Sequence, residues 1–341
     1  MSVLGAQMAA EMAEQPEVLQ RWSTRFREVS DQVAGVLPGA PVGVAFLARG
    51  SSDNAALLGR YAVELATGLP TCLVAPSIAT AYGRSPQDFG GWLVLALSQS
   101  GETPEIVDLA GRYRAAGATV VAVTNAAGSA LAEPASLTVE LSAGRELAVP
   151  ATKTVTAQML AVLAVTSALG GQPVAPDLEQ LPGRVADVLA DEGPVDAAAA
   201  ELVAARRLAV VGRGLVYPAA RETALKLQET TGAMAHAFSA ADFRHGPIAV
   251  CGPDSPALLL AGSGPADEDT RSLRTDLAER GASALLVGSA ADDDVRWPRA
   301  DGATDCVLAT VRGQQLALAL CRRLGVDPDH PAGLRKITPT H

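Results

Sequence analysis

The chain repeats one pattern of apolar runs and glycine turns at a spacing of about 164 residues, and this repeat limits the folds that it can adopt. In each half an apolar run ends in Arg-Gly before a helical pattern, a second run ends in Ser-Gly, and a helical stretch ends in Gly-Ala. The matching segments are Val42–Gly50 with Leu208–Gly214, Leu95–Gly101 with Leu258–Gly264, and Ala116–Ala118 with Arg280–Ala282. Alternating strands and helices predict a parallel sheet with helices on both faces. The predicted fold class is therefore α/β, with two tandem doubly wound parallel-sheet subdomains.

A chain of 341 residues is long enough for two such subdomains. The N-terminal stretch has an amphipathic helical pattern that Gln15-Pro16 interrupts, and a proline-rich stretch separates the two repeats. The expected segments are an N-terminal helical segment at 1–37, a first subdomain at 38–165, a helical linker at 166–199, a second subdomain at 200–326 and a C-terminal tail at 327–341.

Composition and charge argue against several classes of function. A formal net charge of −10 disfavours nucleic acids and anionic membranes as partners. No apolar run reaches the roughly 20 residues of a membrane helix, and the N-terminus lacks the regions of a signal peptide. The cysteines, Cys72, Cys251, Cys306 and Cys321, have no CxxC spacing, so we expect buried thiols and neither disulfides nor a zinc site. These features predict a cytoplasmic protein without a metal.

The segment Leu95–Ile106 has the composition of an anion-binding turn. It predicts a buried strand, a turn rich in hydroxyl groups and the start of a helix. Hydroxyls of Ser98, Ser100 and Thr103, together with the unpaired N–H groups of a helix N-terminus, suit a single phosphate. Gly101 would let the backbone fold closely round it. The turn has no lysine, which argues against a P-loop, but an ordinary helix cap needs only one such hydroxyl and stays open.

Neither glycine turn completes the fingerprint of a dinucleotide-binding fold. Ala48–Asp53 and Gly212–Tyr217 lack G-x-G-x-x-G, and no acidic residue ends the next strand. In the first half, Ser52 instead adds a hydroxyl beside the turn at Ser98, at the sheet edge where ligands bind in such folds. The matching turn of the second half has few hydroxyls and continues into the acidic Asp267–Asp269. We therefore expect only the first half to bind phosphate.

The second half carries titratable groups that suit an aldose–ketose reaction. Glu229 lies near the end of an amphipathic helix, His245 in a Gly-Pro turn that exposes its imidazole, and Lys336 in the C-terminal tail. Such a reaction needs one group to open the sugar ring, one to move a carbon-bound proton, and one to neutralise an oxyanion or form an imine. From spacing alone, a solvated carboxylate and a structural histidine are the more common outcome.

Six motifs occur in order along the chain. They are Arg49–Ala55, Ser98–Thr103, Val149–Thr154, Gly212–Gly214, Glu222–Glu229 and His245–Pro247. Together they resemble the sugar isomerase (SIS) double-domain family, above all the isomerase half of glucosamine-6-phosphate synthase. Pro76–Tyr82 and the tail Pro328–Thr338 are most similar to the SIS-type glucosamine-6-phosphate deaminases. The resemblance implies tandem SIS subdomains of flavodoxin-like topology and no cofactor.

The resemblance also implies roles for single residues. Those that match the family's phosphate site are Ser52, Ser98, Gln99, Ser100 and Thr103. Glu229 matches the carboxylate that moves the proton between C1 and C2 of the sugar. His245 matches the ring-opening histidine, which in the family reaches across from a partner subunit. Lys336 matches the tail lysine at the carbonyl group, Lys226 a second cation near the sugar, and Val149 a residue that lines it.

The implied substrate is a hexosamine phosphate, and the implied assembly is a homodimer with shared active sites. The content of 48% hydrophobic against 19% charged residues also favours a dimer. Because the glutaminase half of the synthase has no counterpart here, we expect deamination, from glucosamine 6-phosphate to fructose 6-phosphate and ammonia.

Two alternatives stay open. Met234 and His236, between Glu229 and His245, depart from the family's pattern, and an acetyl group could be accommodated there. With an N-acetylated substrate, removal of the C2 proton would promote loss of the C3 hydroxyl, as in a dehydratase or lyase. The third interpretation is a sugar-phosphate sensor without catalysis. The residues before the first subdomain are too few for a helix-turn-helix domain, which argues against the sensor.

Overall fold

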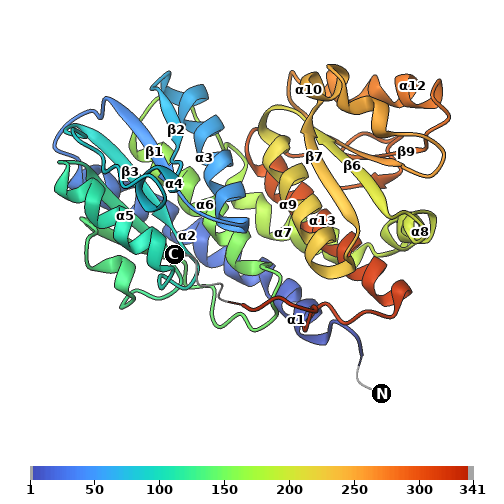
Figure 1. The fold of residues 1–341 in the computed structure, drawn as a ribbon, viewed down its shortest axis with the longest axis horizontal. Helices are drawn as coiled ribbons and strands as arrows, with labels where there is room; N and C mark the ends of the chain where they lie inside the picture. Colours follow the sequence, from blue (N-terminus) through green and yellow to red (C-terminus); the bar gives the residue numbers. More distant parts are fainter. Residues whose placement is uncertain (1–2, 337–341) are drawn as a thin grey trace. The chain divides into compact units, whose positions relative to one another are not determined.

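The computed structural model describes residues 3–336, which contain two five-stranded parallel sheets (Figure 1). The first sheet has the strand order β2-β1-β3-β4-β5, and the second has the order β10-β9-β8-β6-β7. Taken from its other edge, the second order repeats the first, so both sheets have the 2-1-3-4-5 topology of flavodoxin-like folds. The predicted fold class, α/β with two doubly wound parallel sheets, is confirmed.

The register of the strands repeats as well. The strands of the first sheet are β1 (Gly43–Leu47), β2 (Thr71–Leu73), β3 (Trp92–Leu97), β4 (Thr119–Thr124) and β5 (Leu137–Glu140). Those of the second are β6 (Arg207–Gly212), β7 (Met234–Ser239), β8 (Ala257–Ala261), β9 (Ala284–Gly288) and β10 (Val295–Arg296). Phe46 pairs with Leu95 in the first sheet, and Val210 pairs with Leu258 in the second. The repeat in the sequence is therefore a repeat of strand pairing.

Helices precede, connect and follow the strands. In the first part of the chain they are α1 (Ala6–Ala13), α2 (Gln15–Val36), α3 (Ser51–Thr67), α4 (Ser77–Thr80), α5 (Pro104–Ala115) and α6 (Lys153–Ala168). In the second part they are α7 (Leu181–Ala190), α8 (Gly193–Leu202), α9 (Tyr217–Thr231), α10 (Ala240–Arg244), α11 (Asp267–Arg271), α12 (Leu273–Ala278) and α13 (Thr304–Leu324). The break predicted at Gln15-Pro16 separates α1 from α2. No helix in the described range is long and apolar enough to cross a membrane.

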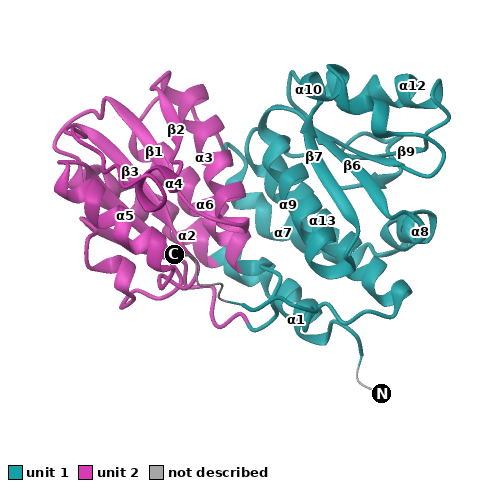
Figure 2. Ribbon diagram, in the orientation of Figure 1, with its two compact units in different colours: residues 1–20, 147–153, 175–336 teal, residues 21–146, 154–174, 337–341 magenta. Residues whose placement is uncertain are grey.

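The chain forms two compact units, each built round one sheet (Figure 2). The first-sheet unit contains 21–146 and 154–174 of the described residues. The second-sheet unit contains 175–336, together with the described residues up to 20 and the short segment 147–153. Helix α1 and segment 147–153 therefore belong to the unit of the second sheet although both lie outside its stretch of sequence. The subdomain limits expected at 38–165 and 200–326 stay predictions.

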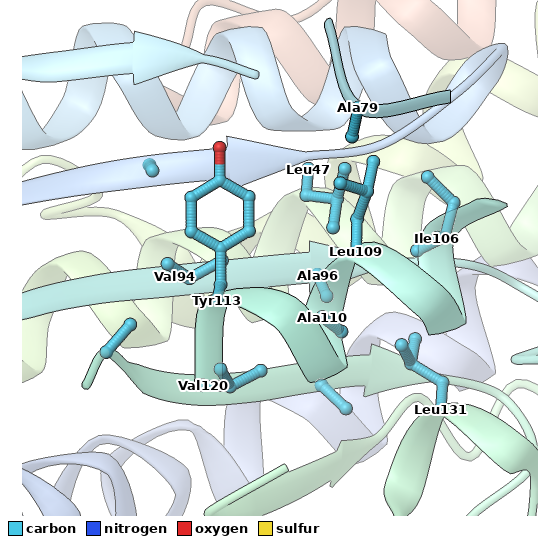
Figure 3. Close-up of a cluster of buried hydrophobic side chains, with 13 residues drawn as sticks. Leu47, Ala79, Val94, Ala96, Ile106, Leu109, Ala110, Tyr113, Val120 and Leu131 are labelled. Carbon is cyan, nitrogen blue, oxygen red and sulfur yellow. The ribbon is translucent and has the colours of Figure 1, made fainter. Parts of the chain in front are cut away.

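In the first-sheet unit, α5 covers one face of the sheet (Figure 3). Leu109 and Tyr113 of α5 pack on Val94 of β3 and Val120 of β4. Every residue of β1 is buried, as are all but the first residues of β3 and β4, so both faces of the central strands are covered. Strands of this kind end at a common edge, which is where the candidate phosphate turn lies.

In the second-sheet unit, α10 and α12 cover one face of the sheet. Phe243 and Leu277 belong to the same buried cluster as Val211 and Leu259. Among the cysteines, Cys251, Cys306 and Cys321 are buried as predicted, whereas Cys72 is exposed. The prediction was wrong for Cys72 because β2 is a three-residue strand at the edge of the first sheet.

Candidate functional site

The turn after β3 joins its hydroxyl groups to one another and to its own backbone. Ser98 Oγ accepts the Gly101 N–H at 3.2 Å and lies 3.2 Å from Thr103 Oγ1. Ser100 Oγ accepts the Glu102 N–H at 3.2 Å. Thr103 precedes α5, yet its side chain makes no capping hydrogen bond to that helix. An ordinary helix cap therefore does not account for this cluster of hydroxyls.

The fold itself requires a glycine at position 101, apart from any need to admit a ligand. Its φ angle is +68°, and a Cβ built on it would lie 1.9 Å from Ser129 Oγ. A side chain at this position would therefore be strained in its backbone and would collide with the residue beneath the turn. Ser129 Oγ is buried and has no hydrogen-bond partner among residues 3–336.

The other predicted phosphate residues of the first-sheet unit lie at or beside this edge. Ser52, in the first turn of α3, is 8% exposed, and its Oγ accepts a hydrogen bond from Gln158 Nε2 at 2.9 Å. Gln99 and Ser100 line an open cavity of about 370 Å³, together with Asn125 and Arg145. The Asn125 N–H donates to the Gln99 carbonyl at 3.0 Å, which ties the turn to the end of β4. Ligand pockets commonly have volumes of about 300–1,000 Å³.

An ion pair that the sequence analysis missed braces the two loops of this edge. Arg49 Nε and a terminal guanidinium nitrogen donate to the carboxylate of Glu105 at 2.8 and 3.0 Å. The pair links the loop before Ser52 to the first turn of α5, and the Glu105 side chain is only 4% exposed. In the second half, Arg213 pairs with Asp269 at 2.5 Å. Arg213 lies 164 residues after Arg49, and Asp269 lies 164 residues after Glu105. The repeated Arg-Gly marks the arginine of each half, but it does not identify the carboxylate that pairs with it.

The matching turn of the second half is occupied by a carboxylate of the chain itself. Asp305 Oδ2 accepts the Ser263 N–H at 2.5 Å, and Asp305 Oδ1 accepts the Trp297 indole N–H at 2.6 Å. Ser263 Oγ donates to the Ala300 carbonyl at 2.5 Å. Asp305 is 2% exposed, and burial raises the pKa of its carboxyl. The backbone N–H and the hydroxyl of Ser263 therefore already have partners within the chain.

In the second-sheet unit, one face of α9 carries a buried ammonium between two carboxylates. Lys226 Nζ lies 3.3 Å from Glu222 Oε1 and also pairs with Glu229 Oε2. The spacings of four and three residues place all three side chains on one side of the helix. The side chains of Lys226 and Glu222 are each 1% exposed, whereas that of Glu229 is 23% exposed. Glu229 is therefore the member of this cluster that solvent or a ligand can reach.

Burial and charge act against each other in this cluster. Burial raises the pKa of Glu229 above its usual value, and the ammonium groups of Lys226 and Lys336 offset only part of that rise. Burial alone would lower the pKa of Lys226, but the two carboxylates outweigh it, so the pKa of Lys226 is raised. A carboxylate with a raised pKa is a stronger base, which suits proton abstraction near neutral pH.

The remaining predicted residues of this unit lie in loops. The ammonium of Lys336 is close enough to Glu229 to offset part of the rise that burial causes in the pKa of that carboxyl. Val149 is half-buried in the segment 147–153. His245 is exposed after α10, and its ring makes no hydrogen bond within the described chain. Arg244 holds α10 in place through the Asp276 carboxylate at 3.1 Å.

The predicted residues thus form two groups. Those in the first-sheet unit are Ser52, Ser98, Gln99, Ser100 and Thr103. Those in the second-sheet unit are Val149, Lys226, Glu229, His245 and Lys336. Contacts join Ser98 to Thr103 and Lys226 to Glu229. Within residues 3–336, no group of His, Cys, Asp and Glu side chains is arranged to hold a metal ion.

Comparison with known proteins gives the family. The pattern of the SIS domain matches residues 43–168 and 201–311. The isomerizing glutamine–fructose-6-phosphate aminotransferase of Methanothermobacter thermautotrophicus is 30% identical over 338 residues, 96% of this chain and 56% of that protein. The enzyme of the same name from Mycolicibacterium paratuberculosis is 32% identical over 316 residues, 85% of this chain and 50% of that protein. The chain spans about half the length of these curated relatives.

Solved structures agree with this. A candidate phosphosugar isomerase from Silicibacter pomeroyi is 30% identical, with a TM-score of 0.82 over 94% of this chain and 99% of that one. Glucosamine-6-phosphate deaminase from Thermotoga maritima has the same fold, with a TM-score of 0.76 over 98% of this chain, all of that one and 21% identity. The two matched ranges each contain strands of one sheet. The chain therefore belongs to the SIS domain family and carries two SIS domains in tandem.

Proposed function

We propose that the chain is a phosphosugar isomerase that deaminates glucosamine 6-phosphate to fructose 6-phosphate and ammonia. The observation that carries the proposal is the cluster on α9, where a buried ammonium fixes a partly exposed carboxylate of raised pKa. The hydroxyl-lined turn after β3 supports a phosphate on the substrate. The names of the relatives, an isomerizing aminotransferase and a glucosamine-6-phosphate deaminase, point to the same chemistry.

In this proposal each group has one task. His245 opens the pyranose ring, which gives an aldehyde at C1 and an amine at C2. Glu229 takes the proton from C2 and returns it to C1, while the nitrogen gives up one proton and the C1 oxygen gains one, so that the C2 amine becomes an imine and C1 a hydroxymethyl group. Water then hydrolyses the imine and releases ammonia, and Lys336 neutralises the charge that develops on the oxygen at C1. Lys226 holds Glu229 in place, and Val149 lines the sugar.

Replacing Ser98 by Ala tests the phosphate turn. The hydroxyl links Gly101 to Thr103, so its loss should disorder the donors that face the phosphate. We expect the KM for glucosamine 6-phosphate to rise about 10- to 100-fold, because a hydrogen bond to a charged group is lost, with kcat changed far less. Ser167→Ala, at an exposed position of α6, is the matched control. An unchanged KM would remove Ser98 from the phosphate site.

A dehydratase or lyase acting on N-acetylglucosamine 6-phosphate is the second candidate. The side chain of Met234 is 72% exposed on β7, and His236 is exposed two residues along the same strand. Such a surface could accommodate an acetyl group. In that case proton removal from C2 would expel the C3 hydroxyl, and no ammonia would form.

One assay separates the two reactions. The protein is incubated with glucosamine 6-phosphate and with its N-acetyl derivative, and both ammonia and the ultraviolet absorbance of a conjugated 2,3-unsaturated aldehyde are followed. Deamination predicts ammonia from the free amine and no unsaturated aldehyde from either compound. Unsaturated aldehyde from the acetylated compound alone would establish the lyase. Binding of both compounds without any product would indicate a sensor.

The proposal includes a homodimer in which His245 completes the site of the partner subunit. The support is that the imidazole is exposed and makes no hydrogen bond among the described residues. Subunit mixing, described in the Discussion, tests it.

A further inference from the structure

The segment that carries Lys336 is attached to the first turn of α1. Asp329 is 6% exposed, and its two carboxylate oxygens accept the N–H groups of Gln7 and Met8, each at 2.8 Å. Asp327 Oδ1 accepts the Gly5 N–H at 3.1 Å. Helix α1 has no acidic residue in its first turn and no side-chain cap of its own. Two carboxylates from the other end of the chain therefore serve as its cap.

The two segments are also closely packed. Gly5 has a φ of +68°, and a Cβ built on it would lie 2.8 Å from Pro328 Cγ. It would lie 2.4 Å from Leu318 Cδ1 of α13. Only glycine fits between the tail and α13 at this position. The approach of the tail to α1 is thus specified by packing as well as by hydrogen bonds.

The same helix holds the loop of Val149. The Glu11 carboxylate, on a residue 4% exposed, accepts the N–H groups of Leu147 and, at 3.2 Å, Ala148. One turn later, Glu14 pairs with Lys153 at 2.6 Å. Helix α1 therefore ties the tail on one side and the loop before Val149 on the other, and all of these residues belong to the second-sheet unit.

Between this attachment and Lys336 the tail has little support of its own. Pro331 is buried, but residues 332–335 are exposed. Asp329 is the last buried charged residue before Lys336. The attachment at α1 is therefore the last buried, hydrogen-bonded charged contact of the tail before Lys336.

We propose that Asp329 is a positioning residue that places Lys336 by fixing the tail to α1, the helix that also fixes the loop of Val149. The inference rests on the proposed function of Lys336. It assigns to α1 a role in the chemistry although none of its own side chains is expected to touch the substrate. It requires that loss of the attachment alters Lys336 without unfolding the rest of the unit.

The composition of the chain offers a direct readout of Lys336. The chain contains three lysines, and Lys153 and Lys226 are each 1% exposed. Brief acylation of the folded protein should therefore modify Lys336 much faster than the other two, and mass spectrometry reports its rate. This rate measures the surroundings of the Lys336 amine independently of any substrate.

The test compares Asp329→Ala with Asp187→Ala, an exposed aspartate of α7. In Asp329→Ala we expect the acylation rate of Lys336 to change at least about threefold and kcat for glucosamine 6-phosphate to fall about 10- to 100-fold, because misplacement of a catalytic group costs that much. The KM should stay within about twofold of its original value, since no phosphate contact is altered. Asp187→Ala should change none of these values. Should Asp329→Ala not fold, Asp329→Asn keeps the volume and one acceptor and should show a smaller change of the same kind.

A double variant separates positioning from other effects. In a Lys336→Ala background, Asp329→Ala should lower kcat no further, because residues that act through one another are not additive. A full further loss would overturn the inference. So would an unchanged kcat and acylation rate in Asp329→Ala when Lys336→Ala has a reduced kcat. Full activity of Lys336→Ala would instead contradict the proposed function, and the acylation rate would still decide whether Asp329 places Lys336.

Discussion

Glu229→Gln is expected to lower the turnover of glucosamine 6-phosphate by at least about 10²-fold, because it removes the base and keeps the size of the side chain. The amide oxygen can still accept a hydrogen bond from Lys226, so the fold of α9 should be retained. The variant should also stop the exchange of the C2 proton with deuterium from the solvent, which reports proton abstraction directly. Ammonia release and mass spectrometry of the sugar measure the two effects.

Glu201→Gln, at an exposed position of α8, is the matched control and should leave both rates unchanged. Undiminished ammonia release by Glu229→Gln would contradict the assignment of the base.

The same variant tests the shared site. Mixed with inactive His245→Ala chains, it should regain partial activity, since a hybrid dimer contains one intact site. Subunits that exchange without any return of activity would rule out the shared site.

Lys226→Met is expected to lower the free energy of unfolding by about 3–5 kcal/mol, because it breaks a buried ion pair by removing one of its partners. Glu222 is 0% exposed and would lose the ammonium that pairs with it. Glu229 would lose the interaction that now offsets the effect of burial on its pKa, so that pKa would rise further. Chemical denaturation measures the loss of stability, and the pH dependence of kcat measures the change at Glu229.

The direction of the pH dependence follows from proton binding. A carboxyl group whose pKa is raised by folding binds more protons in the folded state, so stability falls as pH rises through that pKa. The loss in Lys226→Met should therefore be smaller at about pH 5 than at about pH 8. The acidic limb of the kcat profile should move to higher pH, because Glu229 must be ionised to act. Glu222→Gln combined with Lys226→Met should recover part of the stability but not the activity. A loss of stability independent of pH would contradict this account.

The repeat in the sequence was sufficient to predict two parallel sheets, because strands alternate with helices in each half and the pattern recurs at one spacing. The cluster on α9 was open to prediction in the same way, since residues 222, 226 and 229 share one helical face. What the sequence could not show was the pairing of distant residues. Arg49 meets Glu105, and Asp329 meets the first turn of α1, across 56 and about 320 residues. Periodicity describes one element at a time and carries no information about such partners.

The sequence also did not show to which of the two units α1 belongs. It precedes the first sheet in the sequence, yet it belongs to the second-sheet unit. Its apolar stripe, which includes Met8 and Met12, shows that it is buried but not by what. Cys72 was predicted to be buried and is exposed, because an apolar strand pattern does not show that the strand lies at the edge of its sheet.

The carboxylate of Asp305 at the turn of the second half has a thermodynamic consequence. A ligand that binds only the folded state adds to stability in proportion to RT ln(1 + [L]/Kd), about 2.7 kcal/mol at a hundredfold excess over Kd. Where the turn after β3 is filled by the phosphate of a substrate, its contribution varies with the concentration of that substrate. Asp305 is part of the chain itself, so its contribution to the stability of the turn after β8 does not vary with the concentration of any ligand. If the turn after β3 binds the phosphate of a substrate as proposed, the stability of that turn depends on the ligand concentration, whereas that of the matching turn after β8 does not.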